Sequence, residues 1–395
     1  MHVSERSQRI TPSPTLAISA KAKRLRAQGV DVISFDAGEP DFDTPAHIKQ
    51  AAIDALNAGF TKYTAAAGTD DLRAAICEKL QRENGLAYEP ANIVVSCGGK
   101  HALYNIAQAT LNPGDEVVIP APYWVSYPDQ VLLNDGKPVI VAATAETAFK
   151  ISPAQLAAAL TARTRLVVIN SPSNPTGTVY TPDELRALAA VLAAHPTTLV
   201  ISDEIYEHNL YDGNEQWSIA RYSDDLKRRT LVTNSFSKTY SMTGWRLGWT
   251  ACEKPLADAI GKIQSQSTSN PTSFAQAGAV AALRGPQDCV AKMCAEFDRR
   301  RKRIVQLLNE IPSVTCLLPG GAFYVFPDVS GLFGKTLNGS TINSANDLSE
   351  YLLSHAKVSV VPGEGFGAPN HVRLSYATSF GQIEAGVARI KAAVA

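Results

Sequence analysis

The stretch "SFSKTYSMTGWRLGW", Ser235 to Trp249, places one lysine among hydroxyl-bearing residues directly after an apolar run. That run, "TLVTN" at 230–234, has the composition of a buried strand, and Lys238 and Arg246 follow it. A lysine in a loop is most often solvated. A lysine at a strand end, close to hydroxyls and an arginine, also fits one that binds a phosphorylated carbonyl compound covalently. The rest of the sequence decides between these two interpretations.

The segments around this stretch alternate between strand and helix patterns. "RLVVIN" (165–170) and "TTLVIS" (197–202) are compact apolar runs, typical of fully buried strands. Between them, "TPDELRALAAVLAAH" predicts a helix with Thr181 as N-cap, Pro182 at the first position and Glu184 completing a capping box. Strand, helix and strand at these lengths predict a right-handed βαβ unit. Similar runs at 92–99, 116–122 and 138–144 extend the pattern, so we predict an α/β sheet with helices on both faces.

The C-terminal third has a different pattern, with "RRKRIVQLLNEI", "AFYVFPDV" and "HVRLSYA" mixing helix and strand signals. A chain of 395 residues is long enough for two domains. We predict a large domain at 42–284 built on a mostly parallel sheet. We predict a smaller α+β domain at 285–395, with the N-terminal segment 1–41 packed on it.

The composition argues against several classes of partner. Lys and Arg together number 37, as do Asp and Glu, so no strong net charge favours nucleic acid or membranes. The densest basic run, "RRRKR" at 299–303, lies in a helical pattern and predicts a solvated helix face. The 6 cysteines form no CxxC pair and no zinc-ligand spacing, so we predict no metal site. The start "MHVSERSQRI" lacks an apolar signal core and no run reaches membrane-spanning length, so we expect a cytoplasmic protein.

Polar residues follow three of the predicted strands. Asn174 lies in "SPSNPTG" after the first, Asp203 and Tyr206 lie in "SDEIYEH" after the second, and Lys238 follows the third. In an open parallel sheet, ligands bind beyond the carboxyl ends of the strands. Each residue alone has an ordinary explanation, such as a helix cap, a turn or a solvated lysine. Their convergence at one edge of the sheet favours a shared binding site.

The residue types at this edge match the needs of pyridoxal phosphate. This cofactor requires a lysine amine, a carboxylate at its ring nitrogen, donors at its ring oxygen and an anion site for its phosphate. Asp203 suits the ring nitrogen, and Tyr206 and Asn174 suit the ring oxygen. The predicted phosphate and ring contacts are Ser235, Ser237, Arg246, the helix N-terminus at Gly99, and Trp124 stacked on the ring.

These motifs resemble those of class I pyridoxal-phosphate aminotransferases of fold type I, and the resemblance runs along nearly the whole chain. "GEPDFDTP", "GGK" and "PYWVSYP" are similar to the bacterial aspartate aminotransferase subgroup. The resemblance implies that Lys238 is the Schiff-base lysine and proton carrier and that Asp203 pairs with the ring nitrogen. It also implies a homodimer in which Tyr63 of one subunit reaches the phosphate in the other. One departure is Ser173, where relatives often have Asn, although Asn174 is retained.

An amino-acid substrate carries an α-carboxylate, for which a bidentate guanidinium is the natural partner. Arg373 in "NHVRLSYA" is the predicted partner, with the Gly38 amide, Trp124 and Asn174 nearby. Lys100 begins a predicted helix, where a cation is unfavourable unless an anion compensates. That anion is the cofactor phosphate or, as the subgroup implies, a distal carboxylate of the substrate. We expect Thr15 to add a hydroxyl to the same carboxylate, although a solvated Lys100 and a capping Thr15 stay open.

The predicted activity is therefore ping-pong transfer of the amino group of aspartate to 2-oxoglutarate. A prephenate aminotransferase that forms arogenate, or an enzyme with both activities, is the first alternative, because prephenate also has a second carboxylate. A pyridoxal-phosphate lyase of the same fold is a more distant alternative. A non-enzymatic regulator would need an added DNA-binding domain, for which we expect no room in the short N-terminal segment.

Overall fold

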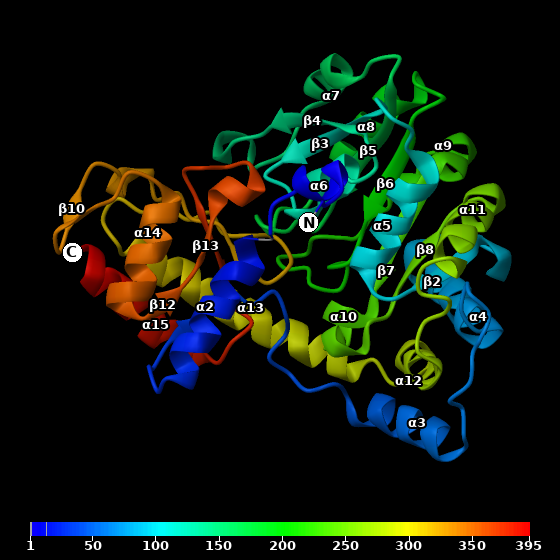
Figure 1. Cartoon of the computed structure of the whole chain (residues 1–395), viewed down its shortest axis with the longest axis horizontal. Coiled ribbons are helices and arrows are strands. Elements are labelled where there is room, and N and C mark those ends of the chain that lie inside the picture. Colours follow the sequence, from blue (N-terminus) through cyan, green and yellow to red (C-terminus); the bar gives the residue numbers. More distant parts are fainter. Residues whose placement is uncertain (1, 13) are drawn as a thin grey trace.

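The centre of the molecule is a seven-stranded sheet with the order β2-β8-β7-β6-β5-β3-β4 (Figure 1). The computed structural model describes residues 2–12 and 14–395. The strands are β2 (Ile93–Ser96), β3 (Glu116–Ala121), β4 (Lys137–Ala142), β5 (Thr164–Asn170), β6 (Leu199–Asp203), β7 (Thr230–Ser235) and β8 (Gly248–Ala251). Neighbours pair in parallel except at β8, which is antiparallel to β2 and β7. The prediction of a mostly parallel sheet is confirmed, whereas β8 was not predicted.

Helices cover both faces of this sheet, as predicted, and the central strands β5, β6 and β7 bury nearly all of their side chains. In β5, Leu166 and Val168 pack on the face covered by α5, α6 and α11, while Val167 and Ile169 pack on the face covered by α7, α8 and α9. The helices of these two layers are α5 (Gly99–Thr110), α6 (Ser126–Leu132), α11 (Lys254–Ser265), α7 (Pro153–Ala159), α8 (Pro182–Ala193) and α9 (Asp224–Arg229). A further layer beside β2 contains α3 (Ala46–Asn57), α4 (Asp70–Lys79) and α12 (Ser273–Arg284).

Helix α8 shows how the local sequence sets an element. Thr181 is its N-cap and Glu184 completes the capping box, as the sequence predicts. The stripe formed by Leu185, Leu188 and Leu192 is buried against the sheet. The βαβ unit β5-α8-β6 brings the ends of two parallel strands side by side.

A second core, here called the C-terminal core, combines buried residues from 297–394 with Ile33, Phe35, Tyr206 and Tyr211. Its strands are β1 (Ile33–Ser34), β9 (Tyr324–Val325), β10 (Thr336–Leu337), β11 (Ser340–Thr341), β12 (Val358–Ser359), β13 (Val361–Pro362) and β14 (Val372–Ser375). Its helices are α13 (Asp288–Asn309), α14 (Ala345–Tyr351) and α15 (Phe380–Val394). Strand β1 pairs in parallel with β12, so the N-terminal segment is part of this core. The division into domains at 42–284 and the remainder stays a prediction.

The N-terminal segment also contains α1 (Glu5–Gln8) and α2 (Pro14–Ala27). One further short helix, α10 (Phe236–Thr239), follows β7. Helix α2 contacts β12 and β13, and Figure 1 shows it in front of the C-terminal core, beside β12. Among the described residues, no helix combines the length and apolar character that crossing a bilayer requires.

The basic run of α13 corrects one expectation. Arg300 and Arg301 are buried rather than solvated, and Arg301 has no exposed side-chain surface. Arg301 binds Asp212 and Asp298 and lies 4.5 Å from the centre of the Tyr211 ring. Only part of the run, including Arg299 and Lys302, is the solvated face that the sequence predicts. Specific carboxylates and an aromatic ring therefore compensate the buried charge.

Candidate active site

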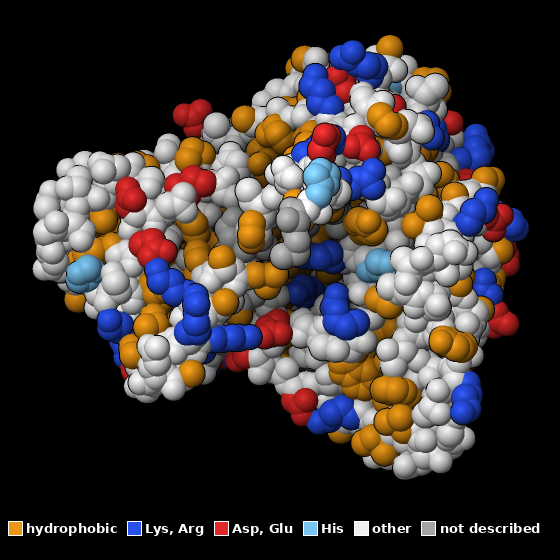
Figure 2. All heavy atoms as spheres, in the orientation of Figure 1, with side chains coloured by type: hydrophobic (Ala, Val, Ile, Leu, Met, Phe, Trp, Pro, Cys, Tyr) orange, Lys and Arg blue, Asp and Glu red, His pale blue; other side chains and the backbone are white. Residues whose placement is uncertain are grey.

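A cavity of about 220 Å³ lies beyond the carboxyl ends of the parallel strands, with Tyr324 and Arg373 of the C-terminal core in its wall. Figure 2 shows a hollow in the middle of this face, with Lys and Arg side chains at its base. The predicted residues that line the cavity are Thr15, Gly38, Gly99, Lys100, Trp124, Asn174, Asp203, Tyr206, Ser237, Lys238, Arg246 and Arg373. Segments far apart in the chain thus meet where the strand-end argument expects them.

Lys238 lies on α10, the short helix that follows β7. Its Nζ donates a hydrogen bond to the carbonyl oxygen of Gly38. Removal from water lowers the pKa of Lys238 to about 8, although Glu39 acts in the opposite direction. A lysine with this pKa has a substantial neutral fraction near neutral pH and can act as a nucleophile and base.

Asp203 ends β6 and is buried beneath the cavity. The Tyr127 hydroxyl donates to its Oδ2 at 2.6 Å, and the Ile205 amide donates to its Oδ1 at 3.3 Å. Burial raises the pKa of Asp203 to about 6, while Tyr127 and Ile205 oppose this change. A buried carboxylate of this kind is suited to bind a cationic group on a ligand.

Arg373 on β14 is a buried guanidinium without a carboxylate partner among the described residues. It donates to Asn174 Oδ1 at 2.9 Å and to the Asp36 carbonyl at 3.0 Å, and its Nε has no hydrogen-bond partner. Its charge lies 4.6 Å from the centre of the Tyr324 ring. Because a buried charge is costly unless paired, this site fits an anionic ligand group.

The Tyr206 hydroxyl lies 2.8 Å from that of Tyr324, which is also part of the cavity wall. Burial raises the pKa of Tyr206 well above its usual value, with Tyr324 contributing in the same direction. Tyr206 therefore stays protonated and is available as a hydrogen-bond donor.

A second anion site is formed where Gly98 precedes α5. Gly98 has a φ of 94°, and a Cβ at this position would lie 2.3 Å from Arg246 Nη2. Arg246 binds the carbonyl oxygens of Thr243 and Cys97, and no carboxylate pairs with it in the described part of the chain. The free amides of the helix N-terminus and this guanidinium favour a phosphate.

Lys100 follows this helix start and lies 5.1 Å from the centre of the Trp124 ring. Burial lowers the pKa of Lys100, with repulsion from Arg246 as a further cause and attraction to Asp129 opposing it. Thr15 and Leu16 on α2 close the same side of the cavity. Three cationic side chains, Lys100, Arg246 and Arg373, therefore surround the space next to Lys238.

Two predicted residues do not line the cavity. Ser235 is buried and caps α10, accepting a hydrogen bond from the Ser237 amide at 3.0 Å. Tyr63 is 91% exposed on the surface of the chain. Their proposed contacts with a phosphate stay predictions.

The cavity also contains residues that the sequence analysis missed. Tyr127 binds Asp203, Tyr324 binds Tyr206, and Asn170 Oδ1 accepts a hydrogen bond from the Asn174 amide. Asn170 ends a buried strand, so the strand-end rule contained the signal for it. Tyr127 and Tyr324 gave no such signal, because only the tertiary fold brings them to the cavity.

Comparisons with known proteins agree with this geometry. Residues 30–390 match the family model for aminotransferase class I and II. The aspartate/prephenate aminotransferase of Cereibacter sphaeroides is 52% identical over 99% of this chain and 98% of its own length. The aspartate aminotransferase of Geobacillus stearothermophilus is 50% identical over 99% of this chain and 98% of its own.

The fold comparison points the same way. The crystal structure of the aspartate aminotransferase from Rhizobium meliloti superposes with a TM-score of 0.96 at 46% identity, covering 100% of this chain and 99% of the other. A family match over most of the chain and full-length relatives near 50% identity assign the chain to one protein family. The chain belongs to the class I and II aminotransferases, which are pyridoxal-phosphate-dependent enzymes.

Proposed function

We propose that this aminotransferase moves the amino group of aspartate to 2-oxoglutarate, forming oxaloacetate and glutamate. The observation that carries the proposal is the unpaired, buried guanidinium of Arg373 in the same cavity as a second cation, Lys100. Arg373 is suited to the α-carboxylate that every amino-acid substrate has. Lys100 is suited to a distal carboxylate, which aspartate and 2-oxoglutarate have and most amino acids lack.

The residues present fit pyridoxal phosphate. The site before α5, with Gly98, the helix amides and Arg246, accommodates a phosphate. Asp203 is a buried carboxylate held by Tyr127, and it would hold a proton at the ring nitrogen. Tyr206 and Asn174 would bind the ring oxygen, and Trp124 would cover the ring. When bound, the cofactor supplies an electron sink that stabilises negative charge at the substrate Cα.

In the proposed mechanism, Lys238 moves the proton at the substrate Cα. Its lowered pKa of about 8 lets the amine accept a proton without being fully protonated beforehand. Arg373 orients the α-carboxylate, and the Gly38 backbone, which already binds Lys238, borders the same space. Thr15 and Leu16 exclude water from the side of α2. Two such half-reactions, one for each 2-oxo acid, complete a ping-pong cycle.

We further propose a cytoplasmic homodimer with shared active sites. Tyr63 is nearly fully exposed, and Ile53, Leu56 and Phe60 are exposed apolar side chains in the neighbouring sequence. Figure 2 shows hydrophobic side chains gathered over the region of α3. An apolar surface next to an exposed tyrosine supports an interface through which Tyr63 reaches the phosphate of the other subunit.

A second candidate is a dual aspartate/prephenate aminotransferase. Relatives with that name, including the Cereibacter sphaeroides protein, cover nearly the whole chain. Prephenate has an α-keto carboxylate for Arg373 and a second carboxylate for Lys100, so the same two cations would serve both substrates.

Amino-donor and acceptor specificity tests the proposal. The purified holoenzyme is assayed with 2-oxoglutarate and aspartate, alanine or phenylalanine, and separately with prephenate and glutamate. We expect aspartate to be the best donor, and Lys100→Ala to slow aspartate more than alanine. Arogenate formation at a comparable rate would establish the dual activity. Equal rates with alanine and aspartate would contradict the assignment of Lys100.

A further inference from the structure

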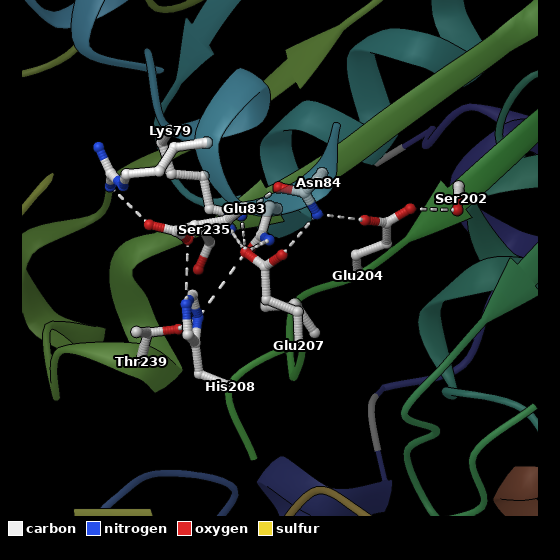
Figure 3. Close-up of polar contacts among 12 residues, drawn as sticks. Lys79, Glu83, Asn84, Ser202, Glu204, Glu207, His208, Ser235 and Thr239 are labelled. Atoms are coloured by element: carbon white, nitrogen blue, oxygen red, sulfur yellow. Dashed lines mark hydrogen bonds and ion pairs between the residues drawn. The ribbon is translucent and has the colours of Figure 1, made fainter. Parts of the chain in front are cut away.

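A buried group of charged and amide side chains lies at the ends of β6 and β7 and beside the end of α4 (Figure 3). Lys79 at the end of α4 forms an ion pair with Glu207 in the loop after β6, and these side chains are 4% and 5% exposed. Asn84 donates to Glu207 at 2.9 Å and to Glu204 at 3.4 Å. Figure 3 shows Asn84 between these two carboxylates. The mechanism above uses none of these residues.

Glu207 is ionised in this environment. Burial opposes the charge, but Lys79, His208 and the hydrogen bonds hold the pKa of Glu207 below its usual value. An ionised carboxylate only accepts hydrogen bonds, so the third partner, Asn234, must present its amide nitrogen. Asn234 Nδ2 donates to Glu207 Oε1 at 2.6 Å. This contact fixes which way the Asn234 amide points.

The other end of the Asn234 amide reaches the turn that carries Lys238. Asn234 Oδ1 accepts a hydrogen bond from the Ser235 amide at 2.7 Å, and Ser235 Oγ accepts one from the Ser237 amide at 3.0 Å. These two contacts hold the first residues of α10, and Lys238 is the third residue of that helix. A continuous series of contacts thus runs from Glu207 through Asn234 and Ser235 to the lysine-bearing turn.

Neither stability nor metal binding explains this arrangement well. Replacing a buried ion pair by apolar residues is often neutral or stabilising, so such a pair is weak evidence for a stabilising role. Glu83, Glu207 and His208 are close enough to share a metal ion. However, Lys79 already binds Glu207 and lies 3.5 Å from Glu83, so its ammonium group takes the place of that cation.

We propose that Glu207 is a positioning residue for Lys238, acting through Asn234. The inference rests on the proposed role of Lys238 as the lysine that binds the cofactor. Glu207 belongs to the same segment as Asp203 and Tyr206, so the contact with Asn234 joins the segment after β6 to the turn after β7. The lysine and the ring-nitrogen carboxylate are thereby held in a fixed relation to each other.

The first test is Glu207→Gln, which keeps the volume but supplies one amide oxygen to three donors. Asn234 then either loses its partner at position 207, so that its side chain is no longer held, or turns its nitrogen toward the Ser235 amide, so that the turn loses a hydrogen bond. We expect the dissociation constant of pyridoxal phosphate, measured by absorbance titration of the cofactor-free protein, to rise about 10-fold. We also expect a changed apparent pKa of the cofactor absorbance band.

The matched control is Glu204→Gln, the same substitution in the same buried group. Glu204 binds Asn84 and Ser202 and makes no contact with Asn234. This control should leave the dissociation constant and the absorbance pKa unchanged, whatever it does to the melting temperature. A Glu207→Gln variant that loses only melting temperature, like the control, would overturn the proposal.

Asn234→Ala provides a second test if Glu207→Gln fails to fold. It keeps the ion pair between Lys79 and Glu207 and removes both side-chain hydrogen bonds of Asn234, the one to Glu207 and the one from the Ser235 amide. We expect the same loss of cofactor affinity, and unchanged affinity would also overturn the proposal. Lys238→Ala in the same titration tests the role of Lys238 separately from that of Glu207. A normal absorbance band in that variant would refute the proposed role of Lys238 itself.

Discussion

At the scale of single residues, the site combines ionisable groups that lie wholly or partly removed from water. Asp203, Lys238 and Arg373 are held in the cavity wall without the partners that would compensate them fully. Such residues lower the free energy of unfolding of the cofactor-free protein, and a bound ligand of opposite charge offsets this loss. The destabilisation should therefore be measurable in the cofactor-free protein.

Asp203→Asn should stabilise the cofactor-free protein at alkaline pH. The pKa of Asp203 is about 6 in the folded chain against an ordinary value of 3.8, so the folded state binds the proton more tightly. Its charge therefore costs nothing below pH 3.8, costs more as pH rises, and costs at most about 3 kcal/mol above pH 6. Urea unfolding of the cofactor-free proteins at pH 5 and pH 8 should show a larger advantage of the variant at pH 8. An advantage independent of pH would contradict this account.

The sequence predicted the residues at strand ends well, because the rule that places them depends only on strand order. Asn174, Asp203 and Lys238 all line one cavity for that reason. Tyr127 and Tyr324 were missed, because their hydroxyls matter only through the partners that the tertiary fold supplies. Arg373 was found from the resemblance rather than from any local pattern.

At the scale of elements, the turn before α5 requires a glycine, Gly98, because a side chain would not fit there. Gly98 has a positive φ and no room for a Cβ beside Arg246, so the guanidinium can approach the helix amides. The sequence indicated both the glycine pair and Arg246 as phosphate contacts, but not that Gly98 leaves room for the guanidinium. The close approach of these two elements is what creates an anion site.

Gly98→Ala should weaken the binding of pyridoxal phosphate more than that of pyridoxal, which lacks the phosphate. The added methyl group would displace Arg246 from the helix N-terminus. Titration of the cofactor-free protein with both compounds measures the difference. The control is Gly339→Ala, which also has a positive φ, at 82°, but no neighbour within 4 Å, and it should change neither affinity. Equal losses for both compounds would show that Gly98 does not act through the phosphate.

Helix α13 shows where charge patterns mislead. A run of five basic residues reads as a solvated face, yet Arg301 is buried between carboxylates and a tyrosine ring. Composition reports the charge of a residue but not the partners that another segment brings to it. By contrast, the capping box of α8 is encoded entirely by neighbours in the sequence and was predicted correctly.

Arg301→Gln should lower the free energy of unfolding by about 1.5–3 kcal/mol, because it removes the charged hydrogen bonds of a fully buried side chain to Asp212 and Asp298. Lys302→Gln is the matched control, since Lys302 is exposed and pairs with the same Asp298. It should cost about 1 kcal/mol or less. Urea unfolding monitored by circular dichroism compares the two. Similar losses in both variants would mean that burial of Arg301 adds nothing.

At the scale of the whole molecule, the proposed dimer makes each active site a joint product of two chains. Tyr63 does not line the cavity of its own chain and is 91% exposed, so its proposed function requires a second copy. The sequence alone predicted this only through the resemblance, because no local pattern distinguishes an interface tyrosine from a solvated one.

Mixing two inactive variants tests that assembly. Lys238→Ala and Tyr63→Ala, unfolded and refolded together, should form heterodimers with one intact site, because Lys238 of one chain meets Tyr63 of the other. Aspartate aminotransferase activity should reappear in the mixture and be absent when each variant is refolded alone. A mixture without activity, despite heterodimers seen by native mass spectrometry, would exclude the shared site.

The pairing of β1 with β12 has a consequence for how the protein is made. Ser34 and Ser359 are neighbours in the fold but 325 positions apart in the chain. During synthesis, the strands of the large sheet leave the ribosome in an uninterrupted series and can assemble early. Ile33 and Phe35 must wait, with their apolar side chains uncovered, until the last strands and α15 emerge. The strand β1 is therefore expected to stay without its partner strand until synthesis of the chain is nearly complete.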